Sequence, residues 1–319
     1  MSKALITGGC GFIGANLIRL MIERGRGEEL AVLDNEVNGL PRSLREASVA
    51  YFKGDVCDTS AVARACAGCD TVIHLAADSR VMGSIADPAF NFEVNVRGTL
   101  NVLLAARDAG VERVVMASTG GAILGDAEPP VHEGLIAQPA APYGASKLAA
   151  EGYGHAFAAS YGMHVTMLRF SNVYGPLSLR KRSAVAHFFK QVLAGRPITV
   201  YGDGSQVRDF VYVQDLCHGI LQAIDARATG VFQLGSGGPT RIDELLREMQ
   251  AITGSQPWPE VRYAPWRAGE VRRTWCDISK SAAAFGFRPA TPLADGLKAT
   301  WQWFLTQVPE GVAEPYDAS

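Results

Sequence analysis

A tyrosine and a lysine stand four positions apart in the sequence PYGASK, residues 142–147. If this stretch begins a helix, Tyr143 and Lys147 lie on the same face, one turn apart. A nearby ammonium lowers the pKa of a phenol, which is otherwise near 10 and too high for a base at neutral pH. Such a pair could take a proton from a hydroxyl group. A Tyr-x-x-x-Lys pair also arises by chance on ordinary helix surfaces, so the rest of the chain must distinguish the two interpretations.

The composition is that of a globular protein with a large core. The 319 residues are 48% hydrophobic and 19% charged, with a formal net charge of -2. This charge gives no reason to expect nucleic acid or an anionic membrane as a partner. No apolar run approaches the roughly 20 residues that span a bilayer, and the N-terminus lacks the features of a signal peptide, so we expect a cytoplasmic protein. Among the six cysteines, Cys66 and Cys69 form a single C-x-x-C, but neither a second pair nor a nearby histidine pair completes a zinc site, and we expect no metal.

Short apolar runs alternate with helical stretches in the first half of the chain. Strands that are apolar throughout and separated by helices indicate a parallel sheet covered on both faces. Right-handed crossovers then give an α/β fold with a doubly wound parallel sheet of the Rossmann type. The runs are KALITGG, LAVLDN, VAYFKGDV, TVIHLAA, RVVMAST and HVTMLRFSN.

The sequence pattern changes after residue 172, where glycine and proline become frequent and apolar runs no longer alternate regularly with helical stretches. We therefore predict a first domain of residues 1–172, to which 209–236 return through the apolar stretch VFQLGSGG. Residues 173–208 and 237–319 are predicted to form a smaller C-terminal substrate-binding region.

Glycines follow the first apolar run in the sequence TGGCGFIGANL. The spacing can be read as Gly9-x-Gly11-x-x-Gly14 or as Gly8-x-x-Gly11-x-x-Gly14, and in both readings the chain turns tightly between a strand and a helix. Such a turn brings backbone N–H groups at the helix start up to a pyrophosphate. Asp34 ends the second apolar run, 20 positions beyond Gly14. A carboxylate there suits a ribose 2′-hydroxyl and repels a 2′-phosphate, so the pattern predicts NAD as the cofactor.

Together with this turn, a series of ordered motifs resembles the extended short-chain dehydrogenase/reductase family, and within it the nucleotide-sugar epimerases and dehydratases. The matches run nearly from end to end of the chain. They are TGGCGFIG, LDN at 33–35, GDV at 54–56, HLAA at 74–77, NVRGTLNVL at 95–103, MAST at 116–119, PYGASK, LRFSNVYGP at 168–176, YGDGSQVRDFVYVQDL at 201–216 and RAGEV at 267–271.

The resemblance implies catalytic roles for the pair in PYGASK. Tyr143 would be the base for a sugar hydroxyl, and Lys147 would lower its pKa and hold the nicotinamide ribose. The family also has a hydroxyl that bridges the sugar and this tyrosine. Strict alignment of STGGAILG places that hydroxyl on Gly120, so we expect Thr119, the nearest hydroxyl, to take the role, with a water molecule as the alternative.

The resemblance also implies the residues that contact each ligand. Contacts with NAD are implied for Gly8, Gly11, Phe12, Ile13, Gly14, Asp34, Asn35, Asp55, Val56, Leu75, Ala76, Ala77, Asn95, Ser118, Tyr143, Lys147 and Phe170. Contacts with a UDP-sugar are implied for Arg80, Ser118, Thr119, Asn172, Arg180, Arg182, Val185, Tyr201, Arg208, Arg267 and Glu270. Arginines suit the diphosphate of such a substrate, and a carboxylate suits its ribose diol.

The residues after Thr119 bear on the reaction type. By resemblance, 4,6-dehydratases and sugar-acid decarboxylases carry acidic residues there, because proton removal at C5 or handling of an enol needs a carboxylate. Gly120 and Gly121 offer none, which favours a 4-epimerase that transiently oxidises C4. A dehydratase or net oxidoreductase of the same fold and a non-enzymatic NAD-sensing protein stay open as alternatives. The family also leads us to expect a homodimer through the helices near 90–108 and 143–160.

A basic loop, RKR at 180–182, follows the Asn172 motif. By resemblance this loop runs beside the hexose and is similar to that of the UDP-glucuronate 4-epimerases. Arg180 or Arg182 would pair with a carboxylate at C6 of a hexuronate. The alternative is a solvated basic loop in an enzyme that acts on UDP-glucose and UDP-galactose, so the sugar stays open between a hexuronate and a hexose.

Overall fold

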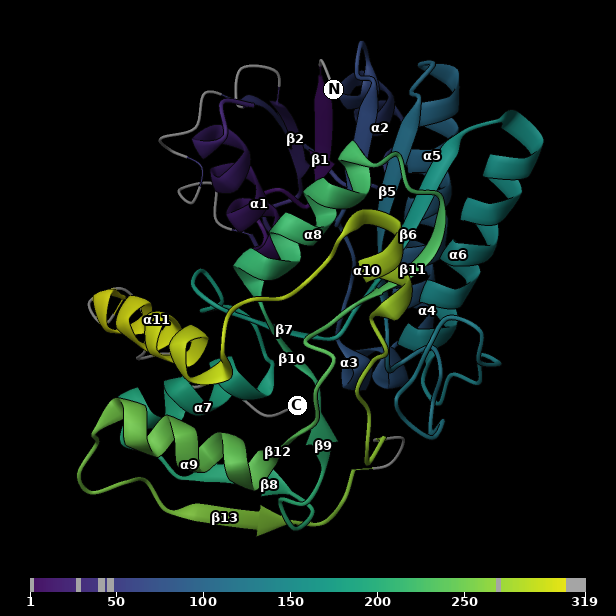
Figure 1. The fold of residues 1–319 in the computed structure, drawn as a ribbon. Helices are drawn as coiled ribbons and strands as arrows, with labels where there is room; N and C mark the ends of the chain where they lie inside the picture. Colours follow the sequence, from purple (N-terminus) through teal and green to yellow (C-terminus); the bar gives the residue numbers. More distant parts are fainter. Residues whose placement is uncertain (1–2, 27–29, 40–43, 45–48, 268–270, 308–319) are drawn as a thin grey trace.

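The computed structural model describes residues 3–26, 30–39, 44, 49–267 and 271–307. Its centre is a seven-stranded sheet in which every neighbouring pair is parallel. The strand order is β11-β6-β5-β4-β1-β2-β3 (Figure 1). The predicted doubly wound parallel α/β fold is therefore confirmed. The strands are β1 Ala4–Thr7, β2 Leu30–Asp34, β3 Ala50–Lys53, β4 Thr71–His74, β5 Arg113–Thr119, β6 His164–Phe170 and β11 Gly230–Leu234.

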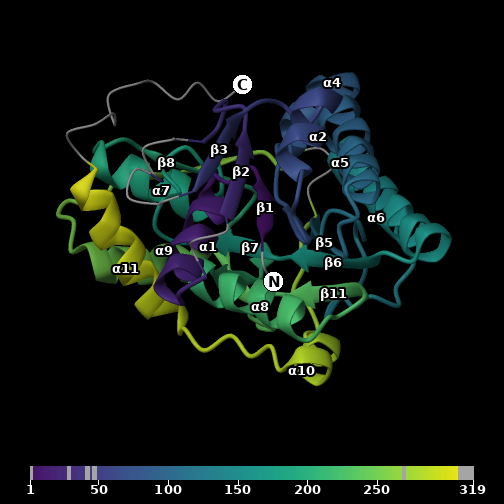
Figure 2. The ribbon, with the colours of Figure 1, turned by 90° about the horizontal axis from the view of Figure 1, so that it is seen from above.

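Helices cover both faces of this sheet, which explains why most of its strands are buried along their length, whereas the edge strand β3 is largely exposed. In β1, Ala4 and Ile6 face one core, and Leu5, which points the other way, faces a second core. Helices α1 (Phe12–Glu23) and α8 (Val213–Asp225) lie over the first core. Figure 2 shows α2 (Thr59–Cys66), α5 (Gly98–Asp108) and α6 (Pro142–Tyr161) together on the opposite side.

The second part of the molecule lies below the sheet in Figure 1 and has a core of its own. Three short strand pairs frame it: β7 (Asn172–Tyr174) with β10 (Phe210–Tyr212), β8 (Ile198–Tyr201) with β13 (Val261–Ala264), and β9 (Val207–Arg208) with β12 (Thr240–Arg241). Buried aromatic and aliphatic side chains fill the space among its helices. These helices are α7 Ala184–Leu193, α9 Ile242–Thr253 and α11 Leu293–Thr306.

One helix of the C-terminal segment packs against the central sheet. Helix α10 (Ser279–Phe285) contacts β11, and the rings of Phe285 and Phe232 meet edge to face at 5.1 Å. The predicted C-terminal region 237–319 therefore includes a piece that covers the sheet. Three further helical turns, α3 (Val81–Ala86), α4 (Pro88–Phe92) and the π-helix η2 (Glu93–Arg97), lead into α5. Within the described residues, no helix has the length and apolar character needed to cross a membrane.

A buried aspartate joins the segments that connect the two parts. Asp209 accepts hydrogen bonds from the Ser171 hydroxyl (3.0 Å) after β6 and from the backbone N–H of Ser236 (2.7 Å) after β11. It also accepts one from the N–H of Cys276 (3.2 Å). A buried carboxylate needs such donors because it has lost its water. Asp209 therefore ties three separate stretches of chain beside the large cavity described next.

Candidate active site

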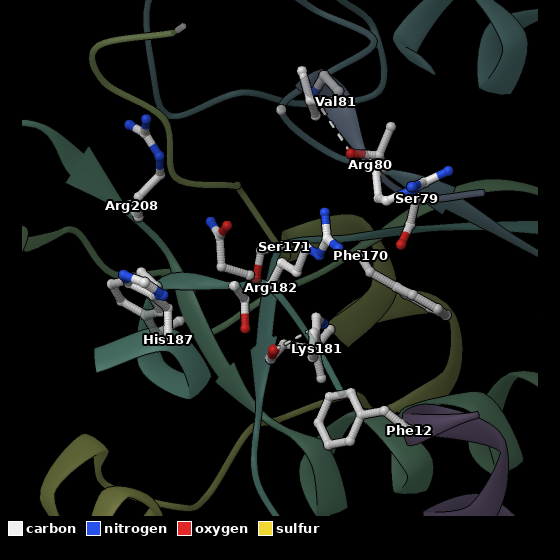
Figure 3. A pocket seen from close by; sticks show the side chains of 18 of the residues that line it. Phe12, Ser79, Arg80, Val81, Phe170, Ser171, Lys181, Arg182, His187 and Arg208 are labelled. Atoms are coloured by element: carbon white, nitrogen blue, oxygen red, sulfur yellow. Dashed lines mark hydrogen bonds between the residues drawn. The ribbon is translucent and has the colours of Figure 1, made fainter. Parts of the chain in front are cut away.

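A cavity of about 1280 Å³ lies between the central sheet and the second part of the molecule. It is larger than the roughly 300–1,000 Å³ of a pocket for one small ligand, so its volume fits a cofactor and a substrate together. The glycine turn after β1, the end of β5 and the start of α6 line it on one side, and the loop before α7 lines it on the other. Figure 3 shows Arg80 and Ser79 facing Arg208 and His187 across it, with Arg182 and Phe170 between.

The glycine turn has the shape that a pyrophosphate requires. Gly8 adopts a left-handed φ of 71°, and a Cβ there would lie 2.8 Å from the backbone nitrogen of Ala76. A Cβ on Gly14 would meet the carbonyl oxygen of Gly8. Helix α1 starts behind Gly11, whose position carries no side-chain cap, so the first N–H groups are left for a ligand. These features fit the phosphates of a dinucleotide.

Asp34 stands at the end of β2 with its carboxylate already oriented. One oxygen accepts the N–H of Cys10 at 2.9 Å, and the other accepts the N–H of Glu36 at 2.7 Å. The residue is 6% exposed, and burial raises the pKa of its carboxyl, while the two N–H donors lower it. A carboxylate fixed in this way can still accept from a ribose hydroxyl, as the sequence pattern predicts.

Several residues expected to contact NAD do not line the cavity. Asn35 donates its amide to the Asp55 carboxylate at 2.7 Å. Val56 is buried in the core, and Asn95 is buried with its amide bonded to the carbonyl of Asp78 (2.9 Å). The residues outside the lining are Asp34, Asn35, Asp55, Val56, Ala76 and Asn95, whereas the lining includes Gly8, Gly11, Phe12, Ile13, Gly14, Leu75, Ala77, Ser118, Tyr143, Lys147 and Phe170.

The tyrosine and the lysine of PYGASK lie on the first turns of α6, which Pro142 starts at its first position. Both line the cavity. Burial raises the pKa of Tyr143 to about 12, a hydrogen bond from Thr119 lowers it, and the negative charge of Asp78 raises it. Burial lowers the pKa of Lys147 to about 8, and its ammonium donates to the Ala117 carbonyl at 3.0 Å. The structure thus brings Tyr143, Lys147 and Thr119 together.

The residue after Thr119, Gly120, lies against the side chain of Gln233. A Cβ on Gly120 would lie 2.6 Å from the side-chain oxygen of Gln233, on β11. A side chain at position 120 would therefore meet Gln233, and Thr119 stays the nearest hydroxyl expected to take the bridging role. A Cβ on Gly121 would lie 3.2 Å from the Thr274 hydroxyl. Thr119 is the hydroxyl that reaches Tyr143.

A buried ion pair beneath the site was missed by the sequence analysis. Arg169 binds Glu151 through two hydrogen bonds of 2.8 and 2.7 Å, and both side chains are only 5% exposed. The Ser118 hydroxyl donates to Glu151 at 2.6 Å. The signal was present, because Glu151 stands one further helical turn beyond Tyr143 and Lys147 on the same face. Its charge raises the pKa of Lys147 and so favours the ammonium.

A second missed acid is Asp78, which is buried beside the site and pairs with Arg80. The Arg80 guanidinium donates to the Asp78 carboxylate at 2.8 Å, and Asn91 and Asn95 hold the Asp78 carbonyl at 3.2 and 2.9 Å. The predicted ligand residue Arg80 lines the cavity. Because its charge is partly matched by Asp78, it presents less positive charge to a ligand than the sequence alone indicates.

Most of the other residues expected to bind the UDP-sugar also line this cavity. The guanidinium of Arg267 lies 3.5 Å from the ring centre of Tyr201. Asn172 donates to the carbonyl of Asp209 at 3.2 Å. The lining includes Asn172, Tyr201, Arg208 and Arg267, together with Thr119 and Ser118. Glu270 lies outside the described residues.

Val185 differs from its expected place. Its side chain is buried in the core of the second part of the molecule and does not line the cavity. Helix α7 starts at Ala184, so Val185 belongs to the first turn, and only its main chain is left for a ligand. Ser183, Ala184 and His187 line the cavity, whereas the side chain of Val185 lies on the core side of the helix.

In the basic loop, Arg180, Lys181 and Arg182 all line the cavity, and the lysine is the least exposed of the three. Arg180 and Arg182 are exposed and line the cavity, and Arg180 donates to the carbonyl of Gly39 at 3.4 Å. Lys181 is folded under them, with its ammonium 3.1 Å from the Val173 carbonyl. Burial lowers the pKa of Lys181 to about 8. Across the described residues, no group of three histidine, cysteine or acidic side chains is arranged to hold a metal ion.

Comparison with known proteins adds to this geometry. The model of the NAD dependent epimerase/dehydratase family matches residues 4–235. The UDP-glucose 4-epimerase of Mycolicibacterium smegmatis is 33% identical over 311 residues, covering 95% of this chain and 98% of that protein. The UDP-glucuronate 4-epimerase of Thermodesulfobacterium geofontis is 30% identical over 321 residues, covering 95% and 96%. A crystal structure of the Thermus thermophilus UDP-glucose 4-epimerase in complex with NAD is 36% identical, with a TM-score of 0.88 over 95% of this chain and 99% of that one.

Proposed function

The chain belongs to the NAD dependent epimerase/dehydratase family and uses NAD as its cofactor, and from this premise we propose that it is a UDP-sugar 4-epimerase. The observation that carries the proposal is the group formed by Tyr143, Thr119 and Lys147, which lies in the same cavity as the glycine turn. A base, a hydroxyl and a cation beside the cofactor turn are what oxidation of a sugar hydroxyl requires.

Each of these residues has a separate task in the proposed reaction. When bound, NAD supplies a hydride acceptor and donor for a carbon that bears a hydroxyl. Tyr143 takes the proton of the C4 hydroxyl and later returns it, and Thr119 hydrogen-bonds the phenol and orients it. The Lys147 ammonium, held by the Ala117 carbonyl, stabilises the phenolate. A cavity of about 1280 Å³ leaves room for the 4-keto sugar to present its other face before the proton returns.

Two glycines favour epimerisation over dehydration. Dehydration needs a carboxylate near C5, and Gly120 and Gly121 carry none. The space at Gly120 is also filled, because a Cβ there would lie 2.6 Å from the Gln233 side chain. The relatives named UDP-glucose and UDP-glucuronate 4-epimerases cover more than nine-tenths of this chain and support the same reaction.

The test uses purified, NAD-loaded protein incubated with UDP-, dTDP-, GDP- and CDP-sugars. We expect chromatography to find the C4 epimer of a UDP-sugar, with no net absorbance change at 340 nm. A net change at 340 nm would point to an oxidoreductase, and loss of water from the sugar to a dehydratase. No conversion of any sugar would favour the NAD-sensing protein instead.

For the sugar, we propose a hexuronate, so that UDP-glucuronate and UDP-galacturonate interconvert. Arg180 and Arg182 bring guanidinium groups to the cavity lining. A guanidinium binds a C6 carboxylate more strongly than a C6 hydroxyl, because charge-assisted hydrogen bonds are about twice as strong as neutral ones. The relative named UDP-glucuronate 4-epimerase is consistent with this choice. A UDP-glucose/UDP-galactose 4-epimerase is the second candidate, favoured by the name of the Mycolicibacterium relative.

The two sugars are distinguished by comparing kcat/KM for UDP-glucuronate and UDP-glucose. We expect a higher kcat/KM for UDP-glucuronate, and we expect Arg182→Met to reduce the ratio of the two kcat/KM values. Arg288→Met, at an exposed arginine outside the cavity lining, is the matched control and should leave the preference as it is. A wild-type preference for UDP-glucose would refute the hexuronate and leave the epimerase proposal standing.

A further inference from the structure

A loop of the second part of the molecule is fastened across the glycine turn. Residues 176–182, here called the strap, connect β7 to α7. The buried side chain of Asn16, on α1 and 2% exposed, donates to the Pro176 carbonyl at 3.0 Å. At the other end of the strap, Arg180 donates to the Gly39 carbonyl at 3.4 Å. The strap is therefore attached at both ends to the part of the chain that surrounds the cofactor turn.

Lys181 is the strap residue that points inward toward this turn. Its ammonium donates to the Val173 carbonyl at 3.1 Å and lies 4.8 Å from the ring centre of Phe12, the first residue of α1 (Figure 3). An ammonium has three N–H donors, and Val173 accepts one of them. Both Lys181 and Phe12 line the cavity, so the remaining donors can serve a ligand held on the glycine turn.

The strap itself has a defined shape. Leu177 adopts a left-handed φ of 69°, and the Ser178 hydroxyl donates to the Gly175 carbonyl at 2.6 Å. The Lys190 ammonium, on α7, donates to the carbonyl of Lys181 at 3.0 Å. These bonds fix the backbone on either side of Lys181, so the direction of its side chain is built into the loop.

We propose that Lys181 binds a phosphate oxygen of NAD and that the strap thereby retains the cofactor, which leaves only when the strap lifts from the glycine turn. The chemistry gives a reason for retention. A reaction that returns its hydride to the substrate regenerates NAD in every cycle and gains nothing from releasing it. The reason for retention rests on the proposed epimerisation, whereas the binding of NAD by Lys181 rests on no particular sugar.

The experiment measures NAD exchange in the holoenzyme without any sugar. Protein loaded with unlabelled NAD is mixed with excess isotopically labelled NAD, and native mass spectrometry follows the replacement over time. We expect Lys181→Met to accelerate exchange about 10- to 100-fold, the range of one hydrogen bond to a charged group. Asn16→Ala, which releases the strap at Pro176 and removes no charge, should accelerate it about fivefold.

The control is a lysine with the same kind of contacts elsewhere. Lys280 donates to the Val231 carbonyl at 2.6 Å and lies 4.7 Å from the Phe232 ring centre, outside the cavity lining. Lys280→Met should exchange NAD at the wild-type rate. A wild-type rate in Lys181→Met would overturn the proposal, and if that variant fails to fold, a wild-type rate in Asn16→Ala would do so. Because no sugar is present, failure of the proposed epimerase activity would leave this result unaffected.

Discussion

Replacement of Lys147 by methionine removes the ammonium beside the proposed base and keeps the length of the side chain. In the ligand-free protein, burial raises the pKa of Tyr143 to about 12. A base that works near pH 7.5 needs that pKa lowered by about 4.5 units, which is about 6 kcal/mol. Two positive charges are available for this, the Lys147 ammonium and the nicotinamide ring of bound NAD.

The share of Lys147 follows from Coulomb's law. Residues one helical turn apart have Cβ atoms about 6 Å apart; for two charges at that separation and an effective dielectric constant of about 20, the interaction is about 2.8 kcal/mol, or about two pKa units. Burial lowers the pKa of Lys147 itself to about 8, so the ammonium and its effect on Tyr143 are present below that pH and fade above it. Lys147→Met should therefore move the acid limb of kcat/KM upward by about two pH units and lower activity at pH 7 by about 100-fold.

The assay is the pH profile of kcat/KM between about pH 5.5 and 10 with NAD-loaded enzyme, since the resemblance also gives Lys147 a role in holding the ribose. NAD content is measured for each variant before the profile is recorded. Lys280→Met serves again as the control, because its ammonium also bonds a backbone carbonyl but lies outside the cavity lining. An acid limb that stays in place in Lys147→Met would refute the tuning role, whatever happens to the maximal rate.

Three further outcomes are expected. Tyr143→Phe should keep its fold and its NAD and lose at least about 100-fold in turnover, the usual contribution of a positioned base; near-normal turnover would remove Tyr143 from the mechanism. Glu151→Gln should lower the free energy of unfolding by about 3 kcal/mol in urea titrations, because the Arg169 guanidinium stays buried without its counter-charge, and replacing both residues by methionine should recover most of the loss. The protein should form a homodimer through the exposed side of α6, where Tyr153 is 40% accessible. A monomeric mass in light scattering at micromolar concentration would contradict this.

The parallel sheet covered on both faces could be expected from the sequence because most of its strands are apolar throughout and alternate with helices, but the order of the strands was not predicted. The stretch VFQLGSGG was expected to return to the sheet, and its β11 pairs with β6. The position of α10 could not be expected in this way. Its contact with β11 depends on the meeting of Phe285 and Phe232, which are far apart in the chain and carry no periodic signal.

Within the site, the spacing of residues along a helix predicted which side chains lie together, whereas the directions of side chains in loops could not be predicted. Tyr143 and Lys147 share a helix face, and that relation follows from their separation alone. In the basic loop the sequence pointed to Arg180 and Arg182, which line the cavity, but gave no sign that Lys181 would lie beside Phe12. The direction of each side chain there depends on the left-handed Leu177 and on bonds that join distant segments. Glu151 could have been found by continuing the helical spacing one more turn.

The carboxylate of Asp209 has a consequence for how the molecule can move. It accepts hydrogen bonds from Ser171, Ser236 and Cys276, which lie on three different segments that connect the sheet to the second part of the molecule. A hinge needs connecting segments that can rotate independently, whereas here all three segments are hydrogen-bonded to one buried carboxylate. We therefore expect the two parts to move as a rigid pair, with motion concentrated in surface loops, and to unfold in one cooperative transition. Asp209→Asn would weaken the hydrogen bonds that join these three segments, and calorimetry should then show a second unfolding transition at a lower temperature.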